Sequence, residues 1–344
     1  MTTEQRRRSP VDILVAVIGI LAAIWVTYWY FANQMAFLAI DHVLSAATRG
    51  AQTAKCDPKT SDGFPLRLDI GCGTFLFADQ GSGVSLATAR FSATAPLYWP
   101  LHVDATASAP AVLRTSASGA EVTATWSKAS ARIDAGWRGL SGGKVQLQGL
   151  DLDGPVALPR LALSGLSADK AEFTATPGTA KPGDYGVSIS LVGIRPRAAD
   201  ARPLPEISAT AQLTALGFGR SLGIDPKRAY AAWIKKAGSM QLDRLFLTIG
   251  PMTVTASGPL TVSPEGLLSG KITLRFVGLD QLPAVLEAYQ PGSRNAVAFA
   301  RLLTAVTRKV DTESGPARQA VLNLSDGNLF FGIVPIGTLP PLVF

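Results

Sequence analysis

Two cysteines, Cys56 and Cys72, are the side chains of this 344-residue sequence whose type and spacing best suit specific chemistry. A cysteine pair can bind a metal, supply a catalytic thiol or form a disulfide bond. A metal site needs further ligands, and neither of the two histidines, His42 and His102, lies at a spacing that completes the pair. A thiol nucleophile needs a neighbouring base, which the same shortage of histidine disfavours. A disulfide is therefore favoured, and two free buried thiols are the alternative.

The N-terminal segment predicts the compartment in which the pair would be oxidised. Residues 13–31 form an uncharged run of 19 residues, about 28 Å long as a helix, which is close to the roughly 30 Å of a bilayer core. A cleavable signal peptide is disfavoured, because the run ends in bulky aromatic residues and not at a small-residue cleavage site. Three arginines at positions 6–8 precede the run and predict a cytoplasmic N-terminus.

These features predict an inner-membrane protein with a single membrane pass. We assign residues 1–12 to a cytoplasmic basic tail, 13–32 to a transmembrane anchor and 33–55 to an amphipathic helical arm. Residues 56–344 would then form a periplasmic β-rich domain. The periplasm is an oxidising space in which a disulfide bond persists, and this favours the disulfide interpretation of the cysteine pair.

The pattern beyond the N-terminal segment predicts a β-rich fold. From Phe64 onward, apolar and polar residues alternate in segments separated by Gly, Pro, Asp or Ser, which is typical of antiparallel strands. Helical signals interrupt this pattern at residues 225–238, 279–290 and 293–310, and Pro226 and Gly238 mark the start and the end of the first of these helices. Near the C-terminus, Asp326-Gly327 predicts a hairpin turn. The predicted fold class is mainly β (α+β), with one N-terminal transmembrane helix. A large antiparallel curved β-sheet or β-sandwich-like domain follows, with about three packed helices in its C-terminal half.

Alternation also places the larger apolar side chains of single strands on one face. In the segment KITLRF the apolar residues fall opposite two basic residues, and in KVQLQ they fall opposite two glutamines. Five residues are therefore candidates for the lining of an apolar groove: Ile272, Leu274, Phe276, Val145 and Leu147.

The sequence contains no motif of a catalytic or cofactor-binding site. It has no G-x-S-x-G elbow, no phosphate-binding loop and no H-E-x-x-H pair. We therefore predict that the protein is not an enzyme and has no catalytic residue, no metal and no cofactor. The formal net charge of +7 is spread along the chain and is not clustered among aromatic residues, so we expect no nucleic-acid partner.

Three segments resemble a known family. GFPLRLDI between the cysteines, GPMTVTASGPLTVSPEGLLSGKITLRFVGLDQL and LSDGNLFFGIVPIGTLPPL are together similar to domain of unknown function 2125, an alphaproteobacterial family of single-anchor envelope proteins. The family implies no activity. The run from Met252 to Leu279 is more distantly similar to AsmA-like envelope proteins, which implies a curved β structure whose inner face shields lipid chains.

The expected function is non-catalytic. We expect a membrane-anchored periplasmic protein that binds or handles lipid, or another hydrophobic envelope component, through an apolar β-sheet surface. The alternative is a structural or interaction scaffold of the cell envelope with a closed β core and no ligand. The expected partners are inner-membrane lipids and other envelope proteins.

Overall fold

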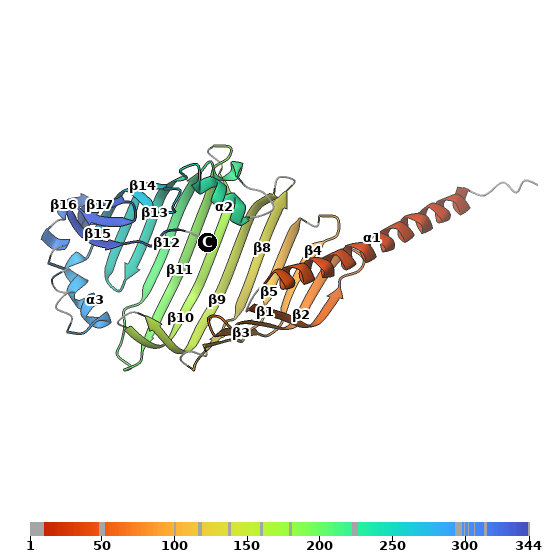
Figure 1. The fold of residues 1–344 in the computed structure, drawn as a ribbon, viewed down its shortest axis with the longest axis horizontal. Helices are drawn as coiled ribbons and strands as arrows, with labels where there is room; N and C mark the ends of the chain where they lie inside the picture. Colours follow the sequence, from red (N-terminus) through yellow and green to blue (C-terminus); the bar gives the residue numbers. More distant parts are fainter. Residues whose placement is uncertain are drawn as a thin grey trace, which may run out of the picture.

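The protein consists of a long N-terminal helix, α1 (Pro10–Ala47), and a large antiparallel sheet that contains most of the remaining chain (Figure 1). The computed structural model describes residues 10–47, 52–99, 101–115, 119–136, 139–158, 161–178, 181–221, 226–292, 298, 300–301, 303–305, 307–312 and 315–342. The prediction of a mainly antiparallel β fold with a large sheet and few helices is confirmed.

Several strands near the N-terminus are five to six residues long, and the longest strands lie near the middle of the chain. Their bounds are β1 Gln52–Asp62, β2 Arg67–Asp79, β3 Val84–Thr88, β4 Phe91–Pro96, β5 His102–Ala107, β6 Ala111–Thr115, β7 Ala120–Thr125, β8 Lys128–Gly136, β9 Gly139–Leu158, β10 Leu161–Pro177, β11 Tyr185–Ala198, β12 Ile207–Leu216, β13 Ser239–Ile249, β14 Met252–Val262, β15 Leu268–Val277, β16 Arg308–Thr312, β17 Gly315–Ser325, β18 Asn328–Phe331 and β19 Val334–Thr338. The short helical elements are η1 Phe218–Arg220, α2 Pro226–Ile234, η2 Leu279–Gln281 and α3 Leu282–Tyr289.

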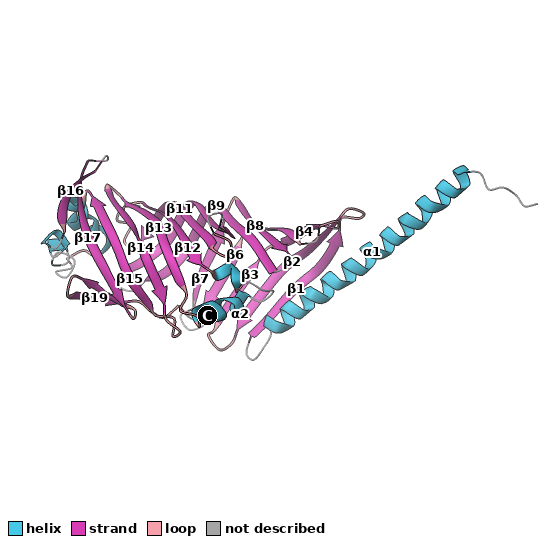
Figure 2. Ribbon diagram, turned by 90° about the horizontal axis from the view of Figure 1, so that it is seen from above, coloured by secondary structure: helices cyan, strands magenta, loops and turns pink. Residues whose placement is uncertain are grey.

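The sheet is a meander in which several long strands are interrupted halfway. β3 pairs with β6, and β4 pairs with β5. On their other sides β6 pairs with β7, and β5 pairs with β8. The long strand β9 pairs with both β7 and β8. At the interruptions the backbone stays hydrogen-bonded, since the amide of Ala89 donates to the carbonyl of Pro110 and that of Ser108 donates to Arg90. The interrupted strands thus stay within one hydrogen-bonded sheet, which Figure 2 shows from above.

Helices cover one face of the sheet at its C-terminal end. The segment between β15 and β16 contains η2, α3 and further helical residues between 298 and 305. There Leu282 and Leu303 pack with Phe276 of β15 and Val254 of β14 in one hydrophobic core. A second core lies under α2, where Trp233 packs against Val262. The Trp233 indole N–H also donates to the carbonyl of Leu216, at 2.9 Å, and so satisfies its polar atom within the core.

The prediction of a transmembrane anchor at residues 13–32, and of a single-pass inner-membrane location, is wrong. Among the described residues, no helix combines the length and apolarity that a membrane crossing requires. The aromatic side chains at the end of the predicted anchor contact the β-sheet region. Trp25 donates to the carbonyl of Pro65 at 2.7 Å, and Trp29 donates to the carbonyl of Arg67 at 3.2 Å. Farther along α1, Asp41 forms an ion pair with Lys59 of β1.

Two predicted boundaries also differ from the structure. β1 begins at Gln52, within the segment that we assigned to a helical arm. The helix predicted to run to Val310 ends earlier, because Val310 lies in β16 and pairs with Ala317 of β17. Pairing with a neighbouring strand overrides the local helical pattern there. The predicted cytoplasmic tail, residues 1–12, falls largely outside the described part of the chain.

Local signals with specific turn chemistry are confirmed. The predicted helix at residues 225–238 corresponds to α2, which begins with Pro226. The Asp326-Gly327 pair forms the turn between β17 and β18, and both residues have positive φ angles, 47° and 78°. The described strands form one sheet of 19 strands, which agrees with the prediction of a large antiparallel sheet.

Candidate functional site

One face of the sheet carries an unbroken row of apolar residues. Residues that pair directly across neighbouring strands lie on the same face, so the register defines the row. Ten strands contribute one residue each, and all ten are apolar: Ala105, Ala131, Val145, Phe173, Ile189, Ala211, Leu245, Ala256, Leu274 and Ala320. We call this set the apolar row.

The adjacent row, on the opposite face, is polar. It contains the residues one position away on the same ten strands: Thr106, Ser130, Gln146, Glu172, Ser190, Thr210, Phe246, Thr255, Arg275 and Gln319. Phe246 is the single apolar member of this polar row. Over these ten strands the sheet therefore has one apolar row on one face and one largely polar row on the other.

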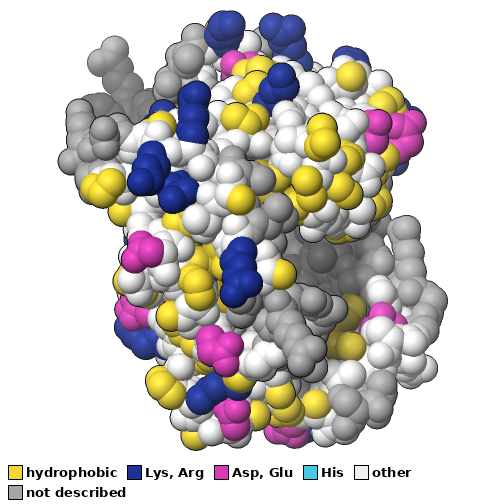
Figure 3. All heavy atoms as spheres, turned by 90° about the vertical axis from the view of Figure 1, so that its left-hand side faces the viewer, with side chains coloured by type: hydrophobic (Ala, Val, Ile, Leu, Met, Phe, Trp, Pro, Cys, Tyr) yellow, Lys and Arg dark blue, Asp and Glu magenta, His cyan; other side chains and the backbone are white. Residues whose placement is uncertain are grey.

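Exposure changes along the apolar row because the helices cover only part of it. At the C-terminal end Ala320 is 6% exposed within the core that the helices help to form, and Ala256 is 4% exposed within a core against which Leu329 of β18 packs. In the middle of the sheet Val145 is 51% exposed and Phe173 is 42% exposed. Seen from the end, the molecule is hollowed on one side, and hydrophobic side chains are visible inside the hollow (Figure 3).

The uncovered part of the apolar face has a floor of alanines. Ala93 of β4 pairs with Ala105, which pairs with Ala131, and Ala107 pairs with Ala129 one step away. Larger side chains border this floor: Phe91, Ile133, Val145 and Phe173 are each between 41% and 51% exposed. Because neighbouring strands are about 4.8 Å apart, the five strands from β4 to β10 give an uncovered width of about 19 Å. We call this surface the apolar trough.

The structure places the five residues predicted to line a groove on the apolar face. Val145 and Leu274 belong to the apolar row itself, and Leu147 lies one step along β9, opposite Ala129. Their environments differ, however. Phe276 is 7% exposed within a core, and Ile272 and Leu274 pack against a neighbouring core, whereas Val145 and Leu147 lie in the trough region.

Sequence analysis missed Phe173 and the alanines of the trough. The segment AEFTATP alternates clearly, but alternation alone does not show which face of β10 joins the apolar face of β9. The register supplies this, since Phe173 pairs with Val145. The alanines gave a weak signal because a small apolar residue is common on either face.

The predicted disulfide bond between Cys56 and Cys72 is confirmed, with Cα atoms 5.5 Å apart. It joins β1 to β2, near the end of the sheet beside α1. The two strands approach closely here, because a Cβ atom at Gly73 would lie 2.5 Å from Cδ of Pro58. The disulfide therefore has a structural role at the edge of the sheet, and Cys72 is 6% exposed.

Ion pairs stabilise the charged side chains of the middle strands. Arg197 binds both carboxylate oxygens of Asp151, at 2.9 and 3.0 Å, and these hydrogen bonds hold the pKa of Asp151 below its usual value. On the polar face, hydrogen bonds from Lys170, and then from Lys144, likewise lower the pKa of Glu172. These groups are solvated and paired, which suits a water-facing surface better than acid–base chemistry.

One comparison with known proteins gives a match. A family model described as "Uncharacterized protein conserved in bacteria (DUF2125)" matches residues 29–340, which is most of the sequence. No curated protein matches the sequence, and no solved structure matches it.

Proposed function

Since the chain belongs to the DUF2125 family, whose description states no activity, we propose its function from the surface itself: the apolar trough binds the acyl chain of a lipid or a similar long hydrocarbon. The observation that supports this most directly is the apolar row. Its members are buried in hydrophobic cores at one end of the sheet and are half exposed, at Val145 and Phe173, in the middle.

The shape of the trough favours a hydrocarbon chain as the ligand. The floor is smooth because it consists of alanines, and the bordering side chains are larger. An uncovered width of about 19 Å exceeds the roughly 15 Å of one leaflet of a bilayer core, so an extended acyl chain fits across the strands. Apolar contact of this kind needs no polar centre, which agrees with the expectation of a non-catalytic protein.

The energy available for binding grows with the length of the bound chain. Each methylene group fully removed from water contributes about 0.8 kcal/mol, and a chain lying on an open surface gains about half of that. Ten methylenes would thus contribute about 4 kcal/mol, and a lipid with two longer chains would gain more before the cost of ordering it. A trough is therefore expected to select long chains over short ones.

To test this, the full chain is purified without denaturant and extracted with organic solvent, and the lipid in the extract is measured by mass spectrometry. We expect co-purifying lipid in near-stoichiometric amount, and much less of it for Phe173→Asp, because a bound chain would cover the new carboxylate. Val192→Asp is the matched control: Val192 is 41% exposed and pairs with Lys170, on the strand next to Phe173 but on the opposite face. A lipid-free wild-type protein, or equal lipid in both variants, would favour a scaffold without ligand.

A further inference from the structure

The polar face carries a cluster of basic side chains near its C-terminal end. Arg275 of β15 pairs with Gln319 of β17, which pairs on its other side with Arg308 of β16. Arg244 of β13 and Lys271 of β15 lie nearby, and all four basic residues are exposed. We call Arg244, Lys271, Arg275 and Arg308 the basic patch. The end view shows Lys and Arg side chains away from the hollowed side on which the hydrophobic side chains are visible (Figure 3).

The arginines of the basic patch differ from the arginines of the earlier strands in having no counter-charge. Arginines on earlier strands each form an ion pair with a carboxylate: Arg114 with Glu121, Arg132 with Asp104, Arg195 with Asp169 and Arg197 with Asp151. Within the part of the chain that the structure describes, no carboxylate lies within 4.0 Å of a cation of the patch. The nearby Asp243 accepts a hydrogen bond from Thr214, at 2.7 Å.

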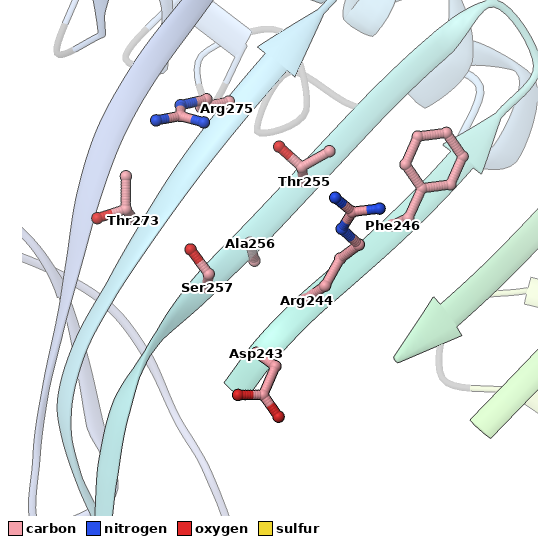
Figure 4. Close-up of a pocket in the computed structure, with 8 residues that line it drawn as sticks. All are labelled: Asp243, Arg244, Phe246, Thr255, Ala256, Ser257, Thr273 and Arg275. Atoms are coloured by element: carbon pink, nitrogen blue, oxygen red, sulfur yellow. The ribbon is translucent and has the colours of Figure 1, made fainter. Parts of the chain in front are cut away.

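Two arginines of the patch border a hollow in the polar face. The hollow has a volume of about 360 Å³, and the carboxylate of Asp243 lines it together with Arg244 and Arg275. β13 and β15 flank β14, so their backbones are about 10 Å apart. Between the two arginines β14 presents the hydroxyl groups of Thr255 and Ser257 (Figure 4).

We propose that this hollow binds a phosphate-bearing group. A guanidinium group has several N–H donors in a planar fork that fits phosphate oxygens, and hydroxyl groups add further donors. The two arginines outnumber the one carboxylate of the lining, Asp243, so the hollow is net positive and raises the local concentration of anions. The site lies on the opposite face from the apolar trough, so the phosphate does not belong to a chain bound there. Its source is either free phosphate or the headgroup of a lipid at a bilayer surface, and the inference does not depend on the proposed function.

A two-probe binding experiment on the full chain distinguishes these sources. The probes are inorganic phosphate, followed by calorimetry, and vesicles of phosphatidylcholine with or without phosphatidylglycerol, followed by co-sedimentation. The test variant is Arg244→Gln with Arg275→Gln. The control variant, Arg114→Gln with Arg132→Gln, loses the same net charge from the same sheet, but from arginines that already have carboxylate partners.

We expect the test variant to bind the effective probe about tenfold or more weakly, because hydrogen bonds to charged groups are the strong ones. The control variant should bind as the wild type does. Binding of phosphate identifies free phosphate as the source, and binding of phosphatidylglycerol vesicles alone identifies a lipid headgroup. No binding of either probe, or equal loss in both variants, would overturn the proposal. Phe173→Asp should leave this binding unchanged, so failure here is separate from failure of the acyl-chain proposal.

Discussion

The trough hypothesis makes a quantitative prediction for the substitution Val145→Thr. Thr has almost the shape of Val and a similar preference for strands, so the change alters polarity while leaving the backbone and the packing volume nearly intact. Val145 is 51% exposed, so about half of its side chain remains available to a ligand. Full burial of Val is worth about 1.5 kcal/mol at the lower end of the usual range, and the remaining half is worth about 0.8 kcal/mol.

The new hydroxyl group weakens binding more than the lost methyl group does. In the free protein the hydroxyl stays hydrated, but under a bound acyl chain it would lose water without gaining a partner, at a cost of about 1–2 kcal/mol. Since Thr keeps one methyl group, part of the apolar contribution survives. The total loss is about 1.5–2.5 kcal/mol, which corresponds to a Kd roughly 10- to 70-fold higher.

The assay is displacement of a fluorescent long-chain fatty-acid probe from the full chain. Val321→Thr is the matched control, because Val321 is 44% exposed and pairs with Thr273 on the polar face. It should bind the probe as the wild type does. Both variants should unfold within about 0.5 kcal/mol of the wild type, as surface substitutions usually do. Equal Kd values for wild type and Val145→Thr would refute the assignment of the trough as the binding surface.

Three further predictions concern stability. Reduction of the Cys56–Cys72 disulfide should lower the free energy of unfolding by about 3 kcal/mol in the chain-entropy model, measured by urea titration with and without reductant; an unchanged midpoint would contradict this. Trp233→Ala should lower the free energy of unfolding by about 3–5 kcal/mol, because a buried indole that also donates a hydrogen bond is lost. A decrease below about 1 kcal/mol in the same titration would show that α2 is not part of the cooperative core. The lowered pKa of Asp151 means that its pairing with Arg197 stabilises the fold above the usual carboxyl pKa and is lost as the pH falls. Asp151→Asn should therefore be less stable than wild type by up to about 1 kcal/mol at neutral pH and equal to it at acidic pH in pH-dependent unfolding, and a constant difference would contradict the pairing.

The features that sequence analysis predicted correctly are those with a local cause. Alternation predicted strands β13 to β15, and the proline and glycine signals predicted α2 and the turn at Asp326-Gly327. The disulfide followed from the shortage of any competing ligand or base. In each case the physical reason lies within a few residues of the chain, so no knowledge of distant neighbours was needed.

The anchor prediction was wrong because hydropathy does not show which groups a side chain contacts. Trp25 and Trp29 suit a membrane interface because each has an apolar ring and one N–H donor. The same properties suit contact with a protein surface that offers backbone carbonyl groups. In the structure Pro65 and Arg67, beyond the end of β1, supply those carbonyls from positions 38 and 40 residues away, a distance that no local window covers.

The trough was hidden for a related reason, because a buried face and an open face have the same alternation. Phe276 and Phe173 occur in similar strand patterns, yet one is 7% exposed and the other 42% exposed. The difference comes from the described helices, which all follow β12 apart from α1. The order of predicted elements therefore contained a usable signal: the helices in the C-terminal half could cover only neighbouring strands, so the apolar face of the earlier strands would be left without cover. An antiparallel sheet normally faces water with polar residues, and in the earlier strands the apolar face is uncovered as well as the polar face. That uncovered apolar face argues for a hydrophobic ligand more strongly than the content of apolar residues in any single strand.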